Sequence, residues 1–295
     1  MSMKLVFPTV AVVIGATSAL GCPAYDPVVS AVQNDDAVAA AQLYEEIVID
    51  GECTDDLREW VGDYLARETF IYAVTGAPTA KDRRDALEQA LGYEKHWRTY
   101  NELGLMDWEG ANYAGASQNF QLAISELVDG DQSHTAENDE IAELYQMASA
   151  AVALSGEPKF PTTRSGATGG IFSMKIRGFE VVEVPLPITF EFDSSEFDEI
   201  GKKFAAALVE HVASINPGSI ALVGHTDPRG TDEYNLGLSI DRAEAVGALL
   251  KGSGFEGEVS IEGRGESELP APPRGIEKGS EEHYRVARRV VFSVN

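Results

Sequence analysis

Apolar residues recur every three to four positions from residue 26 to about residue 154, the spacing of helices that bury one face. The stretch 55–74 carries the clearest stripe, formed by Leu57, Trp60/Val61, Tyr64/Leu65 and Phe70. The stretch 35–50 places Val38, Ala41, Tyr44/Glu45 and Val48 on one helical face. Acidic residues stand at several helix starts, where they favour the positive end of a helix. The pattern predicts an all-helical region.

The pattern changes after residue 155. Residues 156–170 lack periodicity and are rich in Gly, Pro, Thr and Ser, which is typical of a linker. Apolar and polar residues then alternate, as in strands. Beyond residue 195 the sequence predicts a helix, a strand, a helix and two strands, at 197–214, 219–224, 232–250, 259–265 and 287–294. Strands that alternate with helices predict helices packed on one sheet.

The first 21 residues have the pattern of an export signal. Lys4 precedes an apolar run from Leu5 to Ala19, and small residues at Ala19 and Gly21 suit cleavage. No comparable apolar run follows, so the mature chain is expected to lack a transmembrane helix. The prediction is a protein exported to the periplasm, with segments 1–21 (signal), 22–155 (helical domain), 156–170 (linker) and 171–295 (α/β domain).

The chain has two cysteines, Cys22 and Cys53. An oxidising compartment permits a disulfide between them, which would tie the mature N-terminus to the helical region. The alternative is acylation of Cys22, because "SALGC" fits a loose lipoprotein signal. The two fates exclude each other, and the even count of two favours the disulfide.

The net charge of −25 changes what partners are expected. The acidic excess lies mainly in the first 160 residues and would repel phosphate backbones, which argues against nucleic acid as a partner. Solubility is the simplest explanation of this charge. The more balanced second half can still hold a local basic site.

Within the helical region, Tyr113, Ala116, Phe120 and Ala123 alternate small and large side chains at helical spacing. Small residues let two helices approach closely, as in stacked helical hairpins. The stretch resembles a tetratricopeptide repeat, and a plain helical bundle is the alternative. Either arrangement offers surface for an envelope protein that the sequence does not identify.

Polar groups crowd into residues 223–246, "VGHTDPRGTDEYNLGLSIDRAEAV". Along the predicted helix, Leu236, Ile240, Ala243, Gly247 and Leu250 form the expected buried stripe. Asn235, Ser239 and Arg242 form a polar stripe beside it. Asp227 ends the preceding strand and faces the same corner. From spacing alone, Asp227 and Arg242 form either a ligand site or a structural salt bridge.

Four motifs occur in the order of the OmpA-like peptidoglycan-binding domain: "FEFDSSEF", "GHTDPRGTDEYNLGLSIDRAEAV", "GRGESELP" and "ARRVVFSV". Residues from about 186 to 295 resemble this family. The resemblance implies a fold class of α + α/β, with an N-terminal helical domain followed by an OmpA-like α/β sandwich whose helices pack on one mixed sheet. It also implies non-covalent binding of the peptidoglycan peptide stem, at the zwitterionic end of diaminopimelate, beside the cell wall and outer membrane.

Carried over by position, the resemblance gives Asp227 the ligand ammonium and Arg242 the ligand carboxylate. Asn235 and Ser195 would line the site, and Asp193 and Thr226 would fix its loops. This chain has Ala287 where the family usually has Asn, so Arg288 and Arg289 are interpreted as last-strand residues, with at most one side chain near the site. The loop before the last strand, "PAPPRGIEKGSEEHY", is longer than expected. Neither departure is expected to touch Asp227 or Arg242.

Two other function classes remain open. An envelope adapter would act mainly through protein binding by the helical domain. A metal-dependent hydrolase would use His225 and Asp227, but the sequence has no His-Glu-x-x-His or Gly-x-Ser-x-Gly motif. His225 is interpreted as a strand-ending residue that hydrogen-bonds a loop. We expect a non-enzymatic protein without metal or cofactor.

Overall fold

The computed structural model describes residues 21–128, 132, 135–157, 159–161, 169–172, 175–176, 179–180, 184–186, 188–191 and 193–294. Chain contacts divide the protein into two compact units, Met1–Leu103 and Gly104–Asn295, and the division falls inside α5 (Trp97–Glu109). The predicted signal and most of the predicted linker lie outside the described residues. The segment boundaries predicted from sequence therefore stay predictions.

The first unit consists of helices with polar caps. Its members are α1 (Tyr25–Gln33), α2 (Ala37–Ile49), α3 (Asp55–Thr75), α4 (Ala80–Tyr93) and the first part of α5. The side chains of Asp36, Thr54 and Thr79 each accept a hydrogen bond from the backbone N–H three residues ahead. Such caps satisfy donors that a helix start leaves open, which explains where α2, α3 and α4 begin.

The predicted stripe of α3 is confirmed in its main members, since Leu57, Val61, Leu65 and Phe70 are buried. The expected face of α2 is not the buried one. Val38 and Val48 are 73% and 50% exposed, whereas the buried residues of α2 are Ala40 and Ile47. Small apolar residues fill almost the whole first turn of α2, so periodicity alone does not choose its inner face.

Cys22 and Cys53 form a disulfide with an S–S distance of 2.07 Å. Both residues are buried in the core cluster that α1, α2 and α3 share. The bond joins the chain just before α1 to the residue before the cap of α3. A sulfur bonded in this way is not available for acylation.

Helices α6 (Tyr113–Val128) and α7 (Asn138–Ser155) form the start of the second unit. Ala116, Phe120 and Ala123 are fully buried. A Cβ added to Gly104 would lie 2.6 Å from the Phe120 ring, so this glycine permits the close approach. Every residue from Met147 to Leu154 is buried, as expected of a helix enclosed on all sides. The tetratricopeptide-like interpretation stays a prediction.

The sheet of the second unit is mixed, with strand order β3-β6-β4-β5. Its strands are β3 (Val184–Leu186), β4 (Ser219–His225), β5 (Glu258–Gly265) and β6 (Arg289–Val294). β4 and β5 are parallel, and β6 is antiparallel to β4 and β3. A short 3₁₀ turn, η2 (Gly170–Phe172), and the antiparallel pair β1 (Lys175–Ile176) and β2 (Phe179–Glu180) precede this sheet.

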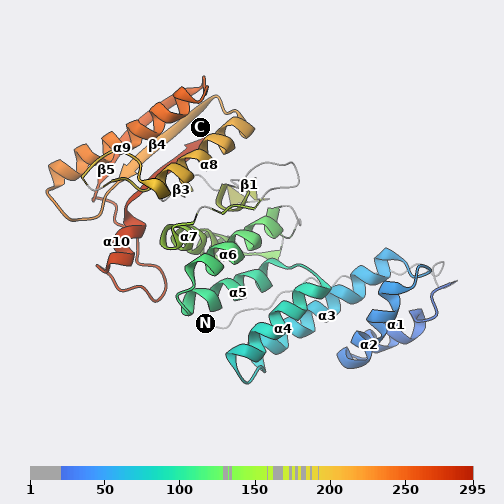
Figure 1. Ribbon diagram of the computed structural model, residues 1–295. Coiled ribbons are helices and arrows are strands. Elements are labelled where there is room, and N and C mark those ends of the chain that lie inside the picture. The colour runs from blue at the N-terminus through green and yellow to red at the C-terminus, as the bar shows by residue number, and fades with distance from the viewer. Residues whose placement is uncertain are drawn as a thin grey trace. The chain divides into compact units, whose positions relative to one another are not determined.

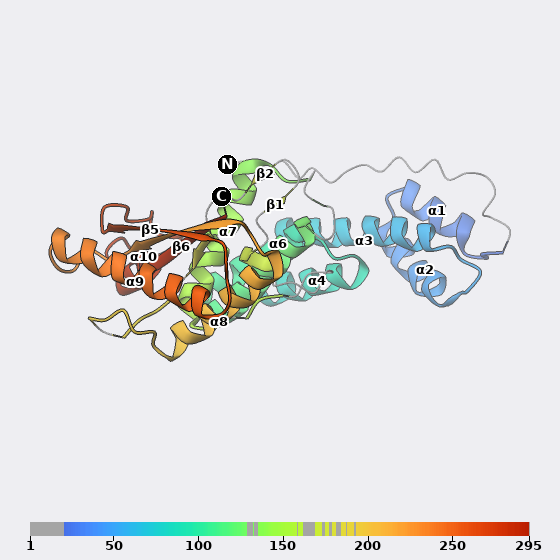
Figure 2. The same cartoon turned by 90° about the horizontal axis from the view of Figure 1, so that it is seen from above.

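Helix α9 (Asp232–Gly252) packs along β4 and β5, and α8 (Glu199–Ile215) contacts α9 beside it (Figures 1 and 2). The predicted fold class, a helical region followed by helices on one mixed sheet, is confirmed. No helix in the described part of the chain is long and apolar enough to cross a membrane.

The segment before the last strand differs from the prediction. Ser280 caps a short helix, α10 (Glu281–Ala287), by accepting a hydrogen bond from the His283 N–H at 3.2 Å. β6 begins only at Arg289. Ala287 therefore ends a helix, and Arg288 lies at the junction between α10 and β6 rather than within a strand.

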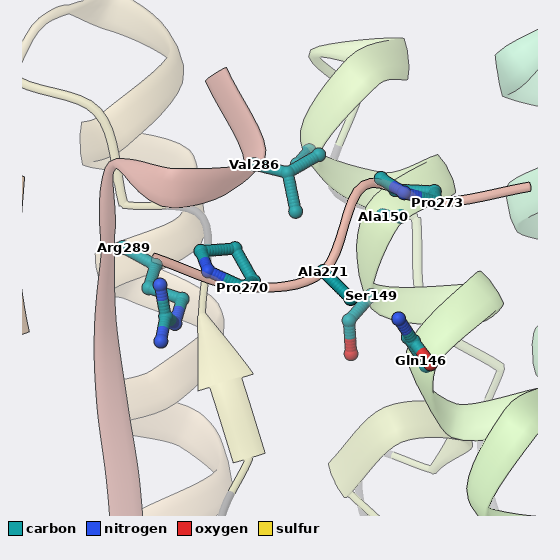
Figure 3. Close-up of a pocket in the computed structure, with 9 residues that line it drawn as sticks. Gln146, Ser149, Ala150, Pro270, Ala271, Pro273, Val286 and Arg289 are labelled. Carbon is teal, nitrogen blue, oxygen red and sulfur yellow. The ribbon is translucent and has the colours of Figure 1, made fainter. Parts of the chain in front are cut away.

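The long loop before α10 packs against helices of its own unit. The Trp108 indole donates to the Arg274 carbonyl at 2.7 Å, and Pro270, Ala271 and Pro273 lie opposite α7 around a small apolar cavity (Figure 3). The buried His283 ring accepts from the Gly279 N–H and bonds the Pro270 carbonyl at 2.8 Å. The elaborated loop is thus fixed by hydrogen bonds at several points.

Candidate functional site

The predicted site residues gather at one end of the sheet. The parallel strands β4 and β5 both end there, so His225, Thr226 and Asp227 leave the sheet beside Gly265. The Thr226 N–H donates to the Gly265 carbonyl at 2.8 Å. Helix α9 begins at this end, and α10 leads into β6 at the same end. Four separate parts of the chain therefore supply side chains to one corner.

Gly224 lets α9 approach the sheet closely enough to place its polar residues. A Cβ on Gly224 would lie 1.9 Å from the Ser239 carbonyl oxygen, a distance that no side chain allows. The Ser239 hydroxyl donates to the Leu236 carbonyl at 2.7 Å and accepts from the Gly265 N–H at 3.0 Å. This serine ties the first turns of α9 to the end of β5.

At the N-terminal end of α9, the polar stripe faces the interior of the protein. Asn235, Ser239 and Arg242 are 1%, 0% and 8% exposed, whereas Leu236 is 45% exposed. The prediction that Leu236 belongs to the buried stripe is wrong. Helix α9 turns its polar face inward because the loops at the end of the sheet offer hydrogen-bonding partners there.

Asp227 is a buried carboxylate held by two arginines. Arg229 donates from its backbone N–H and Nε to Oδ1, both at 3.0 Å, and from Nη2 to Oδ2 at 2.7 Å. Arg288 donates from Nη1 to Oδ2 at 2.7 Å. Burial raises the pKa of Asp227, but the hydrogen bonds from Arg229 and Arg288 outweigh it and lower the pKa to about 2.

Arg242 lies close by without an ion pair among the described residues. Its Nε donates to the Ser194 carbonyl at 3.2 Å, and its guanidinium lies over the Phe190 ring, 5.0 Å from the centroid. Burial and the charge of Arg288 lower the pKa of Arg242, while Asp227 and Asp193 raise it. The group remains a cation, and its terminal nitrogens are not used within the described residues.

The loop at residues 190–197 forms one wall of the site. Phe190 and Phe197 form an isolated antiparallel bridge with stacked rings, and the Glu191 N–H bonds the Glu196 carbonyl at 2.8 Å. Asp193 adopts a positive φ of 56° and accepts a hydrogen bond from the Tyr234 hydroxyl. Ser195 is half-buried in this turn. Asp193 therefore connects the loop to the first turn of α9.

Asn235 and Thr226 hold the loops behind the site. The Asn235 side-chain amide donates to the Asp227 carbonyl at 3.3 Å and to the Glu266 carboxylate. Asn235 is 1% exposed, and its amide ties the Asp227 loop to Glu266. The Thr226 hydroxyl is buried without a hydrogen-bond partner among the described residues.

A cavity of about 190 Å³ opens beside Arg242. Arg242, Arg285, Arg288 and Arg289 line it together with His225, and Ile188, Thr189, Phe190, Asp198 and Ile200 complete the wall. His225 is 3% exposed, and its Nδ1 has no hydrogen-bond partner among the described residues. This nitrogen therefore does not make the expected hydrogen bond from His225 to a loop within those residues.

Asp227 does form salt bridges, but its partners differ from the one that the sequence indicated. The ion pairs of Asp227 are with Arg229 and Arg288, and not with Arg242. At most one of Arg288 and Arg289 was expected near the site, but both line the cavity, and Arg288 pairs with Asp227. The residue lies at the end of α10, from which its side chain reaches Asp227. Arg229, two residues beyond Asp227, had a local signal in the turn-forming Asp-Pro-Arg-Gly sequence.

The described residues contain no group of three or more His, Cys, Asp or Glu side chains that could hold a metal ion. His225 and Asp227 are neighbours in sequence, but Asp227 is bonded to arginines. Burial and the charges of Arg289 and Arg264 lower the pKa of His225 to about 3, so its ring is neutral at physiological pH.

The part of the chain that forms this site matches a known protein family. The OmpA family model matches residues 189–282, which include the 190–197 loop, Asp227 and all of α9. This stretch is an OmpA family domain. The match leaves the helical region outside the family model.

Two relatives illustrate how far the similarity extends. Outer membrane porin F from Pseudomonas aeruginosa is 36% identical over 113 residues, which is 38% of this chain and 32% of that protein. Outer membrane protein A from Bordetella avium is 30% identical over 105 residues, 35% of this chain and 54% of that protein. The chain spans less than two thirds of either relative.

Solved structures with similarity to the OmpA family domain include the peptidoglycan-associated lipoprotein from Burkholderia pseudomallei. The two share 26% identity over 38% of this chain and 88% of that one, with a TM-score of 0.30. The cell wall anchor of the T6SS from Pseudomonas aeruginosa shares 25% identity over 38% of this chain and 78% of that one, with a TM-score of 0.31.

Proposed function

We propose that the OmpA family domain binds peptidoglycan non-covalently at the zwitterionic end of diaminopimelate and anchors the helical region at the cell wall. The observation that carries the proposal is the buried Asp227 and the buried Arg242 at one corner of a matched OmpA family domain. The peptidoglycan-associated lipoprotein and the cell wall anchor named above point the same way by their names.

The chemistry of the two side chains suits a zwitterion. An ammonium and a carboxylate on one carbon need an acceptor and a bidentate donor close together. Asp227 stays ionised down to about pH 2, and Arg242 has free terminal nitrogens within the described residues. Ser195 and Asp193 on the 190–197 loop would face the ligand from the other side.

Arg229 pairs with Asp227 and would have to move for a ligand ammonium to reach this carboxylate. Its side chain is 56% exposed, and its second partner, Glu281, is 3.0 Å away. Moving an exposed arginine costs little, because solvent and Glu281 can solvate its charge. Arg288, whose side chain is 27% exposed, would keep Asp227 in place. The proposed site is thus closed by an internal cation that the ligand replaces.

The helical region would then act as the protein-binding part of an envelope anchor. Its first unit exposes apolar side chains on α2, with Val38 73% and Ile49 84% exposed. Such residues suit a protein partner of the cell envelope. The alternative, an adapter that acts mainly through this helical surface, predicts that loss of wall binding leaves partner binding unchanged.

Cosedimentation with purified diaminopimelate-type peptidoglycan tests the proposal. The full chain should pellet with the wall, and Asp227→Asn and Arg242→Gln should remain in solution. Each substitution removes a charge-assisted contact worth about 1.5–3 kcal/mol, which is about a tenfold to hundredfold loss of affinity.

Matched controls separate this effect from a general charge effect. Asp241→Asn changes the exposed neighbour of Arg242 on α9, and Arg274→Gln removes an arginine on the elaborated loop whose side chain is 58% exposed. Both controls should bind like the unmodified chain. If all five proteins pellet equally while folded, the Asp227 and Arg242 corner is structural and wall binding lies elsewhere.

A further inference from the structure

The cavity beside Arg242 carries more positive charge than one ligand carboxylate requires. We define the arginine cavity as the space lined by His225, Arg242, Arg285, Arg288 and Arg289. Two of these arginines come from the α10–β6 junction and one from α10, which sequence reasoning did not predict. Three of its four arginines therefore follow directly on the elaborated loop.

The carboxylates near the arginine cavity do not neutralise it. Asp198, its one acidic wall residue, accepts from the Thr189 hydroxyl at 2.6 Å and from the Gly201 N–H at 2.7 Å as the cap of α8. Arg288 is paired with Asp227 and Glu281. Arg242 and Arg285 have no carboxylate partner within the described part of the chain. Two guanidinium groups are therefore available to an anion.

A second observation points to a ligand in the same cavity. His225 is 97% buried, and its Nδ1 has no partner within the described residues. Leaving a buried polar atom unpaired costs free energy, so such atoms usually have a partner, in many cases water or a ligand. The neutral imidazole can donate one hydrogen bond to an anion oxygen.

From this geometry we infer that the arginine cavity is an anion subsite that takes a second carboxylate of the bound stem peptide, with Arg285 as its specificity-determining residue. The inference rests on the proposed function. Diaminopimelate supplies the zwitterion, whose carboxylate Arg242 binds, and Arg285 together with His225 selects a neighbouring carboxylate. A stem peptide with that carboxylate amidated would lose this contact.

The first test compares two stem peptides that differ only in whether the second carboxylate is free or amidated. The full chain should bind the free acid at least about tenfold more tightly, as expected for a charge-assisted hydrogen bond. Arg285→Gln should bind both peptides equally, at the affinity of the amidated one. Arg274→Gln, the control, should keep the preference. A preference unchanged in Arg285→Gln, or absent in the unmodified chain, overturns the inference.

The second test separates this inference from the proposed function. Inorganic phosphate is titrated into the full chain while the His225 ring signals are followed by NMR. The signals should shift in the unmodified chain and in Asp227→Asn, and should not shift in Arg285→Gln. If neither peptide binds but phosphate shifts His225 in an Arg285-dependent way, the anion subsite stands and the proposed function fails. If peptides bind through Asp227 but phosphate leaves His225 unchanged, the subsite is wrong and the proposed function stands.

Discussion

At the residue scale, the site contains two buried charged side chains that differ in how fully they are hydrogen-bonded. Asp227 receives four hydrogen bonds from two arginines, whereas Arg242 spends only its Nε on a backbone carbonyl. Sequence reasoning identified Asp227 and Arg242 from their motif. It did not identify Arg288 or Arg285 as site residues, because their placement depends on a short helix that the loop composition did not predict.

Asp227 should stabilise the fold in a pH-dependent way. Its folded pKa of about 2 lies below the ordinary value of 3.8, so its contribution is fully present above about pH 4 and is lost as pH falls towards 2. The shift corresponds to on the order of 2 kcal/mol. Asp227→Asn should reduce the free energy of urea unfolding by about that amount at pH 7 and by much less near pH 2.

Asp241→Asn is the control for this measurement, because Asp241 is exposed on the same helix. It should leave the unfolding free energy nearly unchanged at every pH. A loss in Asp227→Asn that stays constant between pH 7 and pH 2 would show that the carboxylate charge is not the cause.

At the element scale, the close approach of α9 to β4 sets the site geometry. The sequence predicted both elements nearly to their ends, since a buried strand and an amphipathic helix have strong patterns. The sequence pattern indicated the wrong buried face for the first turns of α9. Hydrophobicity predicts which face is buried only where the interior has no hydrogen-bonding partners for polar side chains. Asn235 and Ser239 are buried because they bond loops at the ends of β4 and β5.

Gly224→Ala tests whether the close packing of α9 on β4 is required. The added methyl would lie 1.9 Å from the Ser239 carbonyl, so α9 must move away from the sheet. We expect a loss of about 2–4 kcal/mol in stability and weaker wall binding, as for other overpacked interiors. Thermal unfolding and cosedimentation measure the two effects. Gly237→Ala, where a Cβ meets nothing within 4 Å, should stabilise the fold by up to about 1 kcal/mol and leave wall binding unchanged. Equal behaviour of the two variants would contradict the account.

The disulfide acts on the first unit. Cys22 and Cys53 are separated by 31 residues, and closing a loop of that length stabilises a fold by roughly 3–4 kcal/mol in a chain-entropy estimate. Cys53→Ser should lower the melting temperature of the first unit and leave wall binding intact. Intact-mass analysis of the protein purified from cells also distinguishes a disulfide from an acylated Cys22, since only the latter adds lipid mass.

At the scale of the whole molecule, the boundary between the two compact units lies before the end of the helical region that the sequence pattern indicates. Helices α6 and α7 read as part of the helical region, yet they belong to the compact unit that contains the sheet. Helix α7 is buried along most of its length and contacts β3 and α10. Periodicity predicts that a helix is buried, but it does not say which domain covers it.

Fragment stability tests this division. Residues 104–295 should fold cooperatively, because they retain α7 and the loop that packs on it. Residues 171–295 should be less stable and should bind hydrophobic dyes, because they lose α7 and uncover its partners. Circular dichroism melts and dye binding give the comparison. Identical melting temperatures for the two fragments would place α6 and α7 outside the folding unit.

The most direct test of the central claim is a calorimetric titration of the full chain with free meso-diaminopimelate and, separately, with pimelate. Pimelate has the same carbon chain and both carboxylates but no ammonium. Diaminopimelate should bind at least about tenfold more tightly than pimelate, and Asp227→Asn should abolish the difference. Equal binding of the two ligands by the unmodified chain would contradict recognition of a zwitterion by Asp227 and Arg242.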